Sequence, residues 1–373
     1  MDLANKGYAA PDLAMVPEVD ALLRRLGHGP FDRDRVRTAP GRNLAWLGPT
    51  ESGGEVFVKR LVGAPADVAA RLARLLAFEA FADRVDAAEL RRPRLLGCDE
   101  PARLVAFGYL DEPRSGAQLM VEESFDDELA FAAGQAIGAL HAAAPDPAER
   151  LDRSRLPLPS LELLRGIPEK LFDTISFGQI SAWSLFQNDP RLAEGIAALL
   201  AAENAAPRVP THGDLRLDQF LVSGGELYVT DWEEFRLADP ARDVGSFAGE
   251  WLYRSVLDIV TTRGDAAPGS TAFVDFELDH ETVLRRGVEK LARLRPRTVA
   301  FWRGYRAVRP EVDPGLAERA TAFAGWHTLD RLMASATRTA RLSGIERAAA
   351  GVGRAALLEP AKFAATLGFE ETA

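Results

Sequence analysis

The sequence predicts an α+β fold of two lobes, a small β-sheet lobe with one long helix and a larger, mostly helical lobe. Five strand-like stretches lie in the first third of the chain, and they are broken by turn residues such as Pro-Gly and Ser-Gly-Gly. Nearly all later segments carry the apolar spacing of amphipathic helices. We therefore expect an N-terminal lobe over residues 1–110 and a C-terminal lobe over residues 111–373.

The N-terminal lobe is expected to begin with a helix that ends at Gly27, because glycine is a common helix stop. A long amphipathic helix follows three of the strands and precedes the other two. The expected elements in order are a helix over 13–27, strands within RVRTAPG, RNLAWLG and EVFVKRL, a helix over 66–85, and strands over 93–97 and 103–110.

The C-terminal lobe is expected to contain a helix over 126–144 and another over 192–205, with an inserted helical element within 151–188. A β-hairpin follows, and the remaining chain is helical, in the segments ETVLRRGVEKLARL, RTVAFWRGYRAV and GLAERATAFAGWHTLDRLMASATRTARL.

The composition excludes several classes of protein. A net charge of −10 disfavours a duplex nucleic acid partner and is compatible with a cationic small molecule or a basic peptide, although a solvated acidic surface is the simpler explanation. No apolar run is long enough to span a bilayer, and the start of the chain lacks the pattern of an export signal. The chain has one cysteine, Cys98, and five histidines that lack a paired spacing such as H-x-x-x-H, so a disulfide or a zinc site is not expected. We predict a soluble, cytoplasmic protein.

The hairpin predicts a metal site. In FLVSGGELYVT two apolar runs flank Gly224–Gly225, a two-residue turn signal that pairs Gln219 with Thr230. Gln219 and Asp231 then emerge at the same open end, about 5 Å apart at Cβ. One amide and one carboxylate oxygen suit Mg²⁺, which takes its other ligands from water and phosphates.

Asp214 lies five residues before Gln219, in the loop that leads into the hairpin. This position brings a second carboxylate near the metal, where it can orient or deprotonate a hydroxyl. Phosphoryl transfer needs this combination. A hairpin with ordinary polar ends is the alternative.

Two charged residues of the N-terminal lobe favour the first interpretation. Strand alternation places Lys59 on one face with Phe57 and Leu61, and helical spacing places Glu79 on the apolar face of its helix with Leu75. Each alone would be read as a surface charge whose stem covers apolar residues. Together they are expected to form an ion pair in which the lysine holds nucleotide phosphates.

With these residues in order, the chain resembles the aminoglycoside phosphotransferase and choline kinase group, relatives of the protein kinases. The matching segments are VFVK with Lys59, the helix with Glu79, RLVAFGYL, IGALHAAAP, HGDLRLDQFLV and TDWEEFRLADPARDVG. The resemblance implies a protein-kinase-like fold, ATP and Mg²⁺ as cofactors, and transfer of phosphate to a hydroxyl.

The resemblance also implies roles for residues around the hairpin. Asp214 would be the catalytic base, with His212 supporting its loop, and Asp231 would be the principal Mg²⁺ ligand. Gln219 stands where most of the family has asparagine, so its amide oxygen is displaced by one methylene. Glu233 is close enough in sequence to reach a second Mg²⁺, but it is not among the metal ligands that we expect.

Further residues would bind the nucleotide or brace the site. Asp239 and Asp243 would brace the catalytic loop. The loop over the phosphates is poor in glycine, so Arg42 or Asn43 would supply donors beside Gly41. The strand over 103–110 would bind adenine through the backbone of three residues, Phe107, Gly108 and Tyr109.

The acceptor is open at this stage. GRNLAWLGPTESGGEVFVKRL and THGDLRLDQFLV are similar to the kinases of class V lanthipeptide and thioamide peptide biosynthesis. That resemblance implies phosphorylation of Ser or Thr in a ribosomally made precursor peptide, followed by elimination on a separate lyase partner. The alternatives are a small-molecule kinase acting on an aminoglycoside or sugar hydroxyl, and a pseudokinase scaffold.

Overall fold

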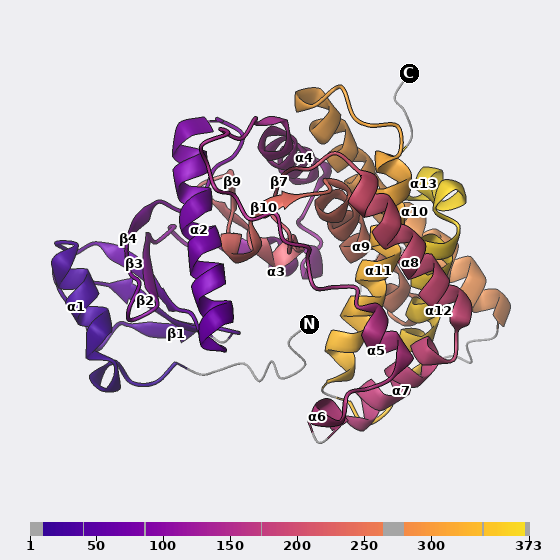
Figure 1. Cartoon of the computed structure of the whole chain (residues 1–373), viewed down its shortest axis with the longest axis horizontal. Coiled ribbons are helices and arrows are strands. Elements are labelled where there is room, and N and C mark those ends of the chain that lie inside the picture. Colours follow the sequence, from indigo (N-terminus) through magenta and orange to yellow (C-terminus); the bar gives the residue numbers. More distant parts are fainter. Residues whose placement is uncertain are drawn as a thin grey trace.

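The computed structural model describes residues 10–39, 41–85, 87–172, 174–263, 280–337 and 339–369. An antiparallel sheet in the N-terminal third and a large helical part after it confirm the predicted α+β fold (Figure 1). The strand order is β1-β2-β3-β5-β4. The elements are α1 (Pro17–Arg25), β1 (Arg37–Ala39), β2 (Leu44–Pro49), β3 (Glu55–Arg60), α2 (Pro65–Val85), β4 (Leu95–Asp99) and β5 (Leu104–Gly108).

The first predicted helix is split in two. Residues Leu13–Met15 form a 3₁₀ turn, and α1 begins only at Pro17. Proline suits the first helical position because that position needs no N–H bond, whereas inside a helix it removes one. The predicted helix over 13–27 was therefore wrong in its continuity and right in its end near Gly27.

The two faces of the sheet pack against different helices. Val56 and Val58 of β3 belong to a core with Leu22 of α1, while Val105 of β5 packs with Leu72 of α2. The alternation predicted for β3 is thus confirmed for its apolar side chains, and Lys59 is left on the face that borders α2 and the helical part.

The predicted hairpin forms with the predicted register. Strands β8 (Phe220–Ser223) and β9 (Glu226–Val229) are antiparallel, and Thr230 N–H donates to the Gln219 carbonyl at 2.9 Å. Gly224 and Gly225 both have positive φ, 58° and 81°, as a tight two-residue turn requires. β6 (Arg114–Ser115) adds a third strand, and β7 (Val209–Thr211) pairs separately with β10 (Arg236–Ala238).

The helical part packs around two long helix–helix contacts, α4 with α10 and α9 with α11, and in each pair the helices run parallel. The inserted element predicted within 151–188 is helical and packs against α8 and α11. Among the described residues no helix is long and apolar enough to cross a membrane. The helices are α3 (Gly116–Val121), α4 (Asp127–Ala142), α5 (Leu161–Arg165), α6 (Glu169–Phe172), α7 (Phe177–Gln187), α8 (Pro190–Ala205), α9 (Ala241–Leu257), α10 (His280–Val308), α11 (Leu316–Ala336), α12 (Gly344–Leu358) and α13 (Pro360–Leu367).

Candidate active site

A cleft of about 1320 Å³ lies between the sheet and the helical part. Its N-terminal wall comes from β2, β3, β5 and the loop before β2, and its floor from residues 213–219 and 230–234. Its far wall comes from α9 and α11. Every catalytic, nucleotide-binding and metal-binding residue predicted from the sequence lines this cleft.

The hairpin delivers Gln219 and Asp231 to the floor of the cleft, as predicted. Gln219 lies in the 3₁₀ turn before β8, and Asp231 follows Thr230, the cross-strand partner of Gln219. The side-chain amide of Gln219 makes no hydrogen bond within the described chain, and Asp231 uses only one carboxylate oxygen, Oδ1. Two oxygens are thus left for a hard cation such as Mg²⁺, which commonly takes only one or two carboxylates from protein.

Asp214 lies in a loop that Asp243 holds. The carboxylate of Asp243 accepts hydrogen bonds from the backbone N–H groups of His212 (2.7 Å) and Gly213 (2.9 Å), and from Nε2 of His141 (3.1 Å). Burial works against ionisation, yet these donors hold the pKa of Asp243 below its ordinary value. Gly213 has φ of +84°, and a Cβ there would lie 2.6 Å from the Glu234 carbonyl oxygen, so the loop needs glycine.

His212 supports the same loop, as predicted. Its ring is fully buried against Trp232, and Nε2 lies 2.8 Å from the Thr230 carbonyl, which only accepts. Nε2 must therefore carry the proton, and Nδ1 is left to accept the backbone N–H of Asp214 at 3.4 Å. The imidazole thus links the loop that carries Asp214 to the end of the hairpin.

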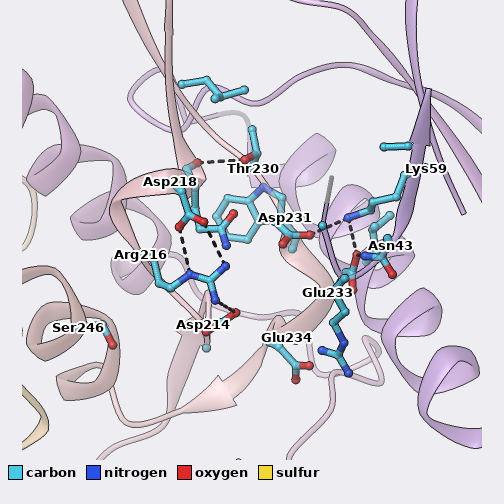
Figure 2. A pocket seen from close by; sticks show the side chains of 18 of the residues that line it. Asn43, Lys59, Asp214, Arg216, Asp218, Thr230, Asp231, Glu233, Glu234 and Ser246 are labelled. Atoms are coloured by element: carbon cyan, nitrogen blue, oxygen red, sulfur yellow. Dashed lines mark hydrogen bonds and ion pairs between the residues drawn. The ribbon is translucent and has the colours of Figure 1, made fainter. Parts of the chain in front are cut away.

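Asp214 itself is open to the cleft, with 49% of its side chain exposed. Nη1 of Arg216 donates to its Oδ2 at 3.2 Å, and Nε of Arg216 donates to Asp218 at 3.0 Å (Figure 2). Asp214 raises the pKa of Arg216, so the guanidinium stays charged beside the carboxylate. Sequence reasoning missed Arg216, although a basic residue two positions after the predicted base was visible.

Lys59 is paired differently from the prediction. Its ammonium contacts Asp231 Oδ1 at 2.6 Å and also Glu233 Oε1 (Figure 2). Glu79 instead accepts from Nε of Arg92 at 2.9 Å. The predicted Lys59–Glu79 ion pair was therefore wrong, because Glu79 forms its ion pair with Arg92, in the segment before β4. Both residues still line the cleft.

The pKa values in this cluster follow from the pairing. Burial disfavours the charge on Lys59, but Asp231 and Glu233 outweigh it, and the pKa of Lys59 lies above its ordinary value. Partial burial works against ionisation of Asp231, but Lys59 outweighs it and holds the pKa of Asp231 well below its usual range. The ammonium and this carboxylate therefore keep their charges across the neutral range.

Glu233 is the centre of a buried polar cluster. Nη1 of Arg71, a fully buried residue of α2, donates to Glu233 Oε2 at 2.9 Å, and Nδ2 of Asn43 donates to Oε1 at 2.8 Å. Sequence reasoning missed Arg71. The signal was present, because Arg71 lies seven residues before Phe78 and so shares the inward face of its helix.

The loop over the phosphate region has its side chains already engaged. Arg42 contacts Asp67 of α2 at 3.2 Å, and the amide oxygen of Asn43 accepts from the backbone N–H of Val62 at 3.2 Å. Gly41 lines the cleft beside them. Direct contact of Arg42 with phosphate therefore requires it to leave Asp67, a partner whose side chain is 42% exposed.

The strand predicted to bind adenine borders the same cleft. Phe107, Gly108 and Tyr109 all line it. Two of their backbone donors are engaged within the protein, Gly108 N–H with the Arg94 carbonyl at 2.9 Å and Tyr109 N–H with the Glu55 carbonyl at 3.3 Å. The contact to adenine stays a prediction.

The far wall of the cleft is one face of α11. Its lining residues recur at helical spacing and cover about 20 Å of helix at 1.5 Å per residue. They are Phe323, Trp326, His327, Asp330, Arg331 and Ala334, followed by the C-cap residue Thr337. Sequence reasoning named the C-terminal helices as the place of the acceptor site but singled out none of these residues.

This chain belongs to the phosphotransferase enzyme family, whose sequence model matches residues 42–273. It is an O-phosphotransferase, and the matched segment contains every predicted site residue except Gly41. No curated protein matches the chain by sequence.

Solved structures agree on the fold. An amicoumacin kinase in complex with AMP-PNP, Ca²⁺ and amicoumacin is 15% identical with a TM-score of 0.53, covering 94% of each chain. A choline/ethanolamine kinase family protein from Mesorhizobium loti is 17% identical with a TM-score of 0.51, covering 96% of this chain and 99% of that one.

Proposed function

We propose that the protein transfers the γ-phosphate of ATP to an alcohol, with Asp214 as the base and Mg²⁺ as the metal. The observation that carries this proposal is that Asp214 is half-exposed on the floor of the same cleft that Gln219, Asp231 and α11 line. Gln219 and Asp231 would hold Mg²⁺, which would neutralise charge on the phosphate oxygens.

The reaction needs little covalent chemistry from the protein. The acceptor oxygen forms a bond to the γ-phosphorus, the bond from that phosphorus to the bridging oxygen breaks, and ADP leaves with the electron pair. Asp214 aligns the hydroxyl and takes its proton. Lys59 contributes a fixed positive charge for the phosphates, and Arg216 supplies a second cation beside Asp214.

We propose a precursor peptide as the acceptor, with Ser or Thr as the phosphorylated residue and a separate lyase partner that eliminates the phosphate. Two features support this proposal, the similarity of the two quoted sequence segments to peptide-modifying kinases and the length of the α11 wall. An extended peptide rises about 3.3 Å per residue, so about 20 Å of wall accommodates roughly six residues.

A cationic small molecule is the second candidate. Asp330 of α11 lies on the wall without a hydrogen bond or ion pair to the described chain, and burial raises its pKa. The indole of Trp326 borders the same cleft, and an acid beside an aromatic face suits an amine.

The test is transfer of labelled γ-phosphate from ATP into an extract of the source cell, with products separated by size and Asp214→Asn as the control. Label in a peptide fraction that is absent with the variant supports the peptide acceptor. Label in small molecules alone contradicts the peptide acceptor and supports the cationic small molecule. Label in neither fraction, while ATP still binds, contradicts both and favours a scaffold.

A further inference from the structure

We propose that Glu233, held by Arg71 and Asn43, is the residue that positions Lys59 for the nucleotide. This is the role that the sequence predicted for Glu79. The inference rests on the ATP-binding role proposed above for Lys59, and it assigns the positioning group to the segment after the hairpin instead of to helix α2.

The first argument is the geometry of Glu233. Only 5% of the residue is exposed, and its carboxylate receives Lys59 and Asn43 on Oε1 and Arg71 on Oε2. A carboxylate with donors on both oxygens cannot rotate freely. It therefore presents Oε1 to Lys59 in one orientation.

The second argument is the burial of Arg71. An arginine without exposed surface is costly unless its charge is paired, and Arg71 has two carboxylate partners, Glu233 at Nη1 and Asp67 at 3.1 Å from Nε. Nη1 donates to Glu233 Oε2 and also to Asn43 Oδ1 at 3.3 Å. Nη2 donates to the Val62 carbonyl at 2.5 Å. The guanidinium thus joins α2, the loop before β2 and the segment after β3 around a single carboxylate.

The third argument concerns metal binding. Lys59 has two carboxylate partners, and one of them, Asp231, is the principal Mg²⁺ ligand in our proposal. When Asp231 turns to a metal, Lys59 keeps Glu233 and stays directed into the cleft. Glu79 does not hold Lys59 in this way, because its carboxylate is paired with Arg92 at 2.9 Å, and Arg92 also contacts Asp83.

The experiment measures acylation of Lys59 by an acyl-phosphate derivative of ATP, which reacts with an amine next to bound phosphates. Labelling of the wild type, competed by ATP, is established first. If the wild type is neither labelled nor binds ATP, the ATP-binding role of Lys59 fails and the inference falls with it. If labelling occurs, the variants test Glu233 alone.

We expect Glu233→Gln and Arg71→Met to slow the labelling of Lys59 about tenfold at saturating Mg²⁺ and to raise KM for ATP similarly, as loss of a supporting contact commonly does. Arg71→Lys keeps the charge and should recover part of the rate. Arg84→Met is the matched control, since Arg84 is an exposed arginine of the same helix paired with Glu149. It should label like the wild type.

Two results would overturn the proposal. The first is slower labelling in Glu79→Gln than in Glu233→Gln. The second is a Glu233→Gln variant that changes only the Mg²⁺ concentration needed for half-maximal activity, which would make Glu233 a metal ligand. If Arg71→Met does not fold, Asn43→Ala removes the neutral hydrogen-bond donor to Glu233, and slower labelling of Lys59 in that variant tests the proposal in its place.

Discussion

The indole of Trp232 lies flat on the ring of Phe78, with centroids 3.6 Å apart and planes within 9° of parallel. Trp232 directly follows Asp231, which we propose as a metal ligand, and Phe78 belongs to α2 of the N-terminal part. The two halves of the cleft are therefore joined by an aromatic contact one residue away from the chemistry. The stack is also fully enclosed, since Phe78 has no exposed surface and Trp232 only 3%.

Removing this contact should destabilise the protein. We expect Phe78→Ala to lower the free energy of unfolding by about 3–5 kcal/mol, because a large buried ring leaves a cavity. Chemical denaturation followed by circular dichroism measures the change. Phe177→Ala is the control, because that ring is 76% exposed and should change stability by less than about 0.5 kcal/mol. Equal effects at the two positions would contradict the packing described here.

Loss of the base should abolish turnover and spare nucleotide binding. We expect Asp214→Asn to lower kcat by about 10²–10⁴, the usual contribution of a general base, while the Kd for ATP changes little. Steady-state rates and calorimetric titration of ATP measure the two quantities. Asp34→Asn, at an exposed carboxylate that does not line the cleft, should behave as wild type. A variant at Asp214 that keeps its kcat would remove this residue from the mechanism.

The amide at 219 should govern the metal requirement. Gln219→Leu removes the side-chain oxygen at nearly constant volume, and we expect the Mg²⁺ concentration for half-maximal activity to rise by roughly tenfold or more. Gln219→Asn retains an amide oxygen and should raise this Mg²⁺ concentration less. Activity measured across Mg²⁺ concentrations at fixed ATP gives both values. An unchanged requirement in Gln219→Leu would exclude the side chain from the metal site.

His141 should make stability depend on pH. Burial lowers its pKa, although the hydrogen bond that it donates to Asp243 works in the other direction, so the folded protein binds a proton here less readily than the unfolded chain. Below the unfolded pKa of about 6.5 the unfolded state takes up that proton first. The free energy of unfolding should therefore fall as pH decreases from about 6.5, by up to about 1.4 kcal/mol per pH unit for this group.

The contribution of His141 is isolated by comparison. His141→Gln should weaken this dependence, measured as thermal or chemical unfolding at a series of pH values from 7.5 to about 5. The contacts of Nδ1 with Tyr305 (3.0 Å) and of Nε2 with Asp243 (3.1 Å) allow a neutral ring to donate once and accept once. Identical slopes in the variant and the wild type would show that His141 is not the group responsible.

The fold and the cleft floor could be predicted because they depend on local patterns. Periodicity indicated α2, and the Gly224–Gly225 turn set the register that places Gln219 beside Thr230. In each case the determining residues lie within a few positions of one another, so one sequence contains the necessary information.

The ion pairs could not be predicted in the same way. Glu79 and Lys59 both point inward, but the partner of a buried charge depends on which distant segment arrives nearest. Arg92 reaches Glu79 from the segment before β4, and Glu233 reaches Lys59 from more than 170 residues away in the chain. Spacing within one element shows that a charge is buried, whereas only the tertiary arrangement shows what neutralises it.

Helix α2 must present several side chains in one direction, so its rotation about its own axis matters as well as its length. Arg71, Arg74 and Phe78 face residues 232–235 from successive turns, with Nε of Arg74 donating to the Glu233 carbonyl at 2.7 Å. One residue inserted between Arg71 and Phe78 would turn one end about 100° relative to the other. Either the ion cluster or the aromatic stack would then face solvent. Insertions or deletions of whole turns are therefore the ones that this helix can accommodate. The rotation of α2 about its axis fixes how the N-terminal wall of the cleft meets the floor.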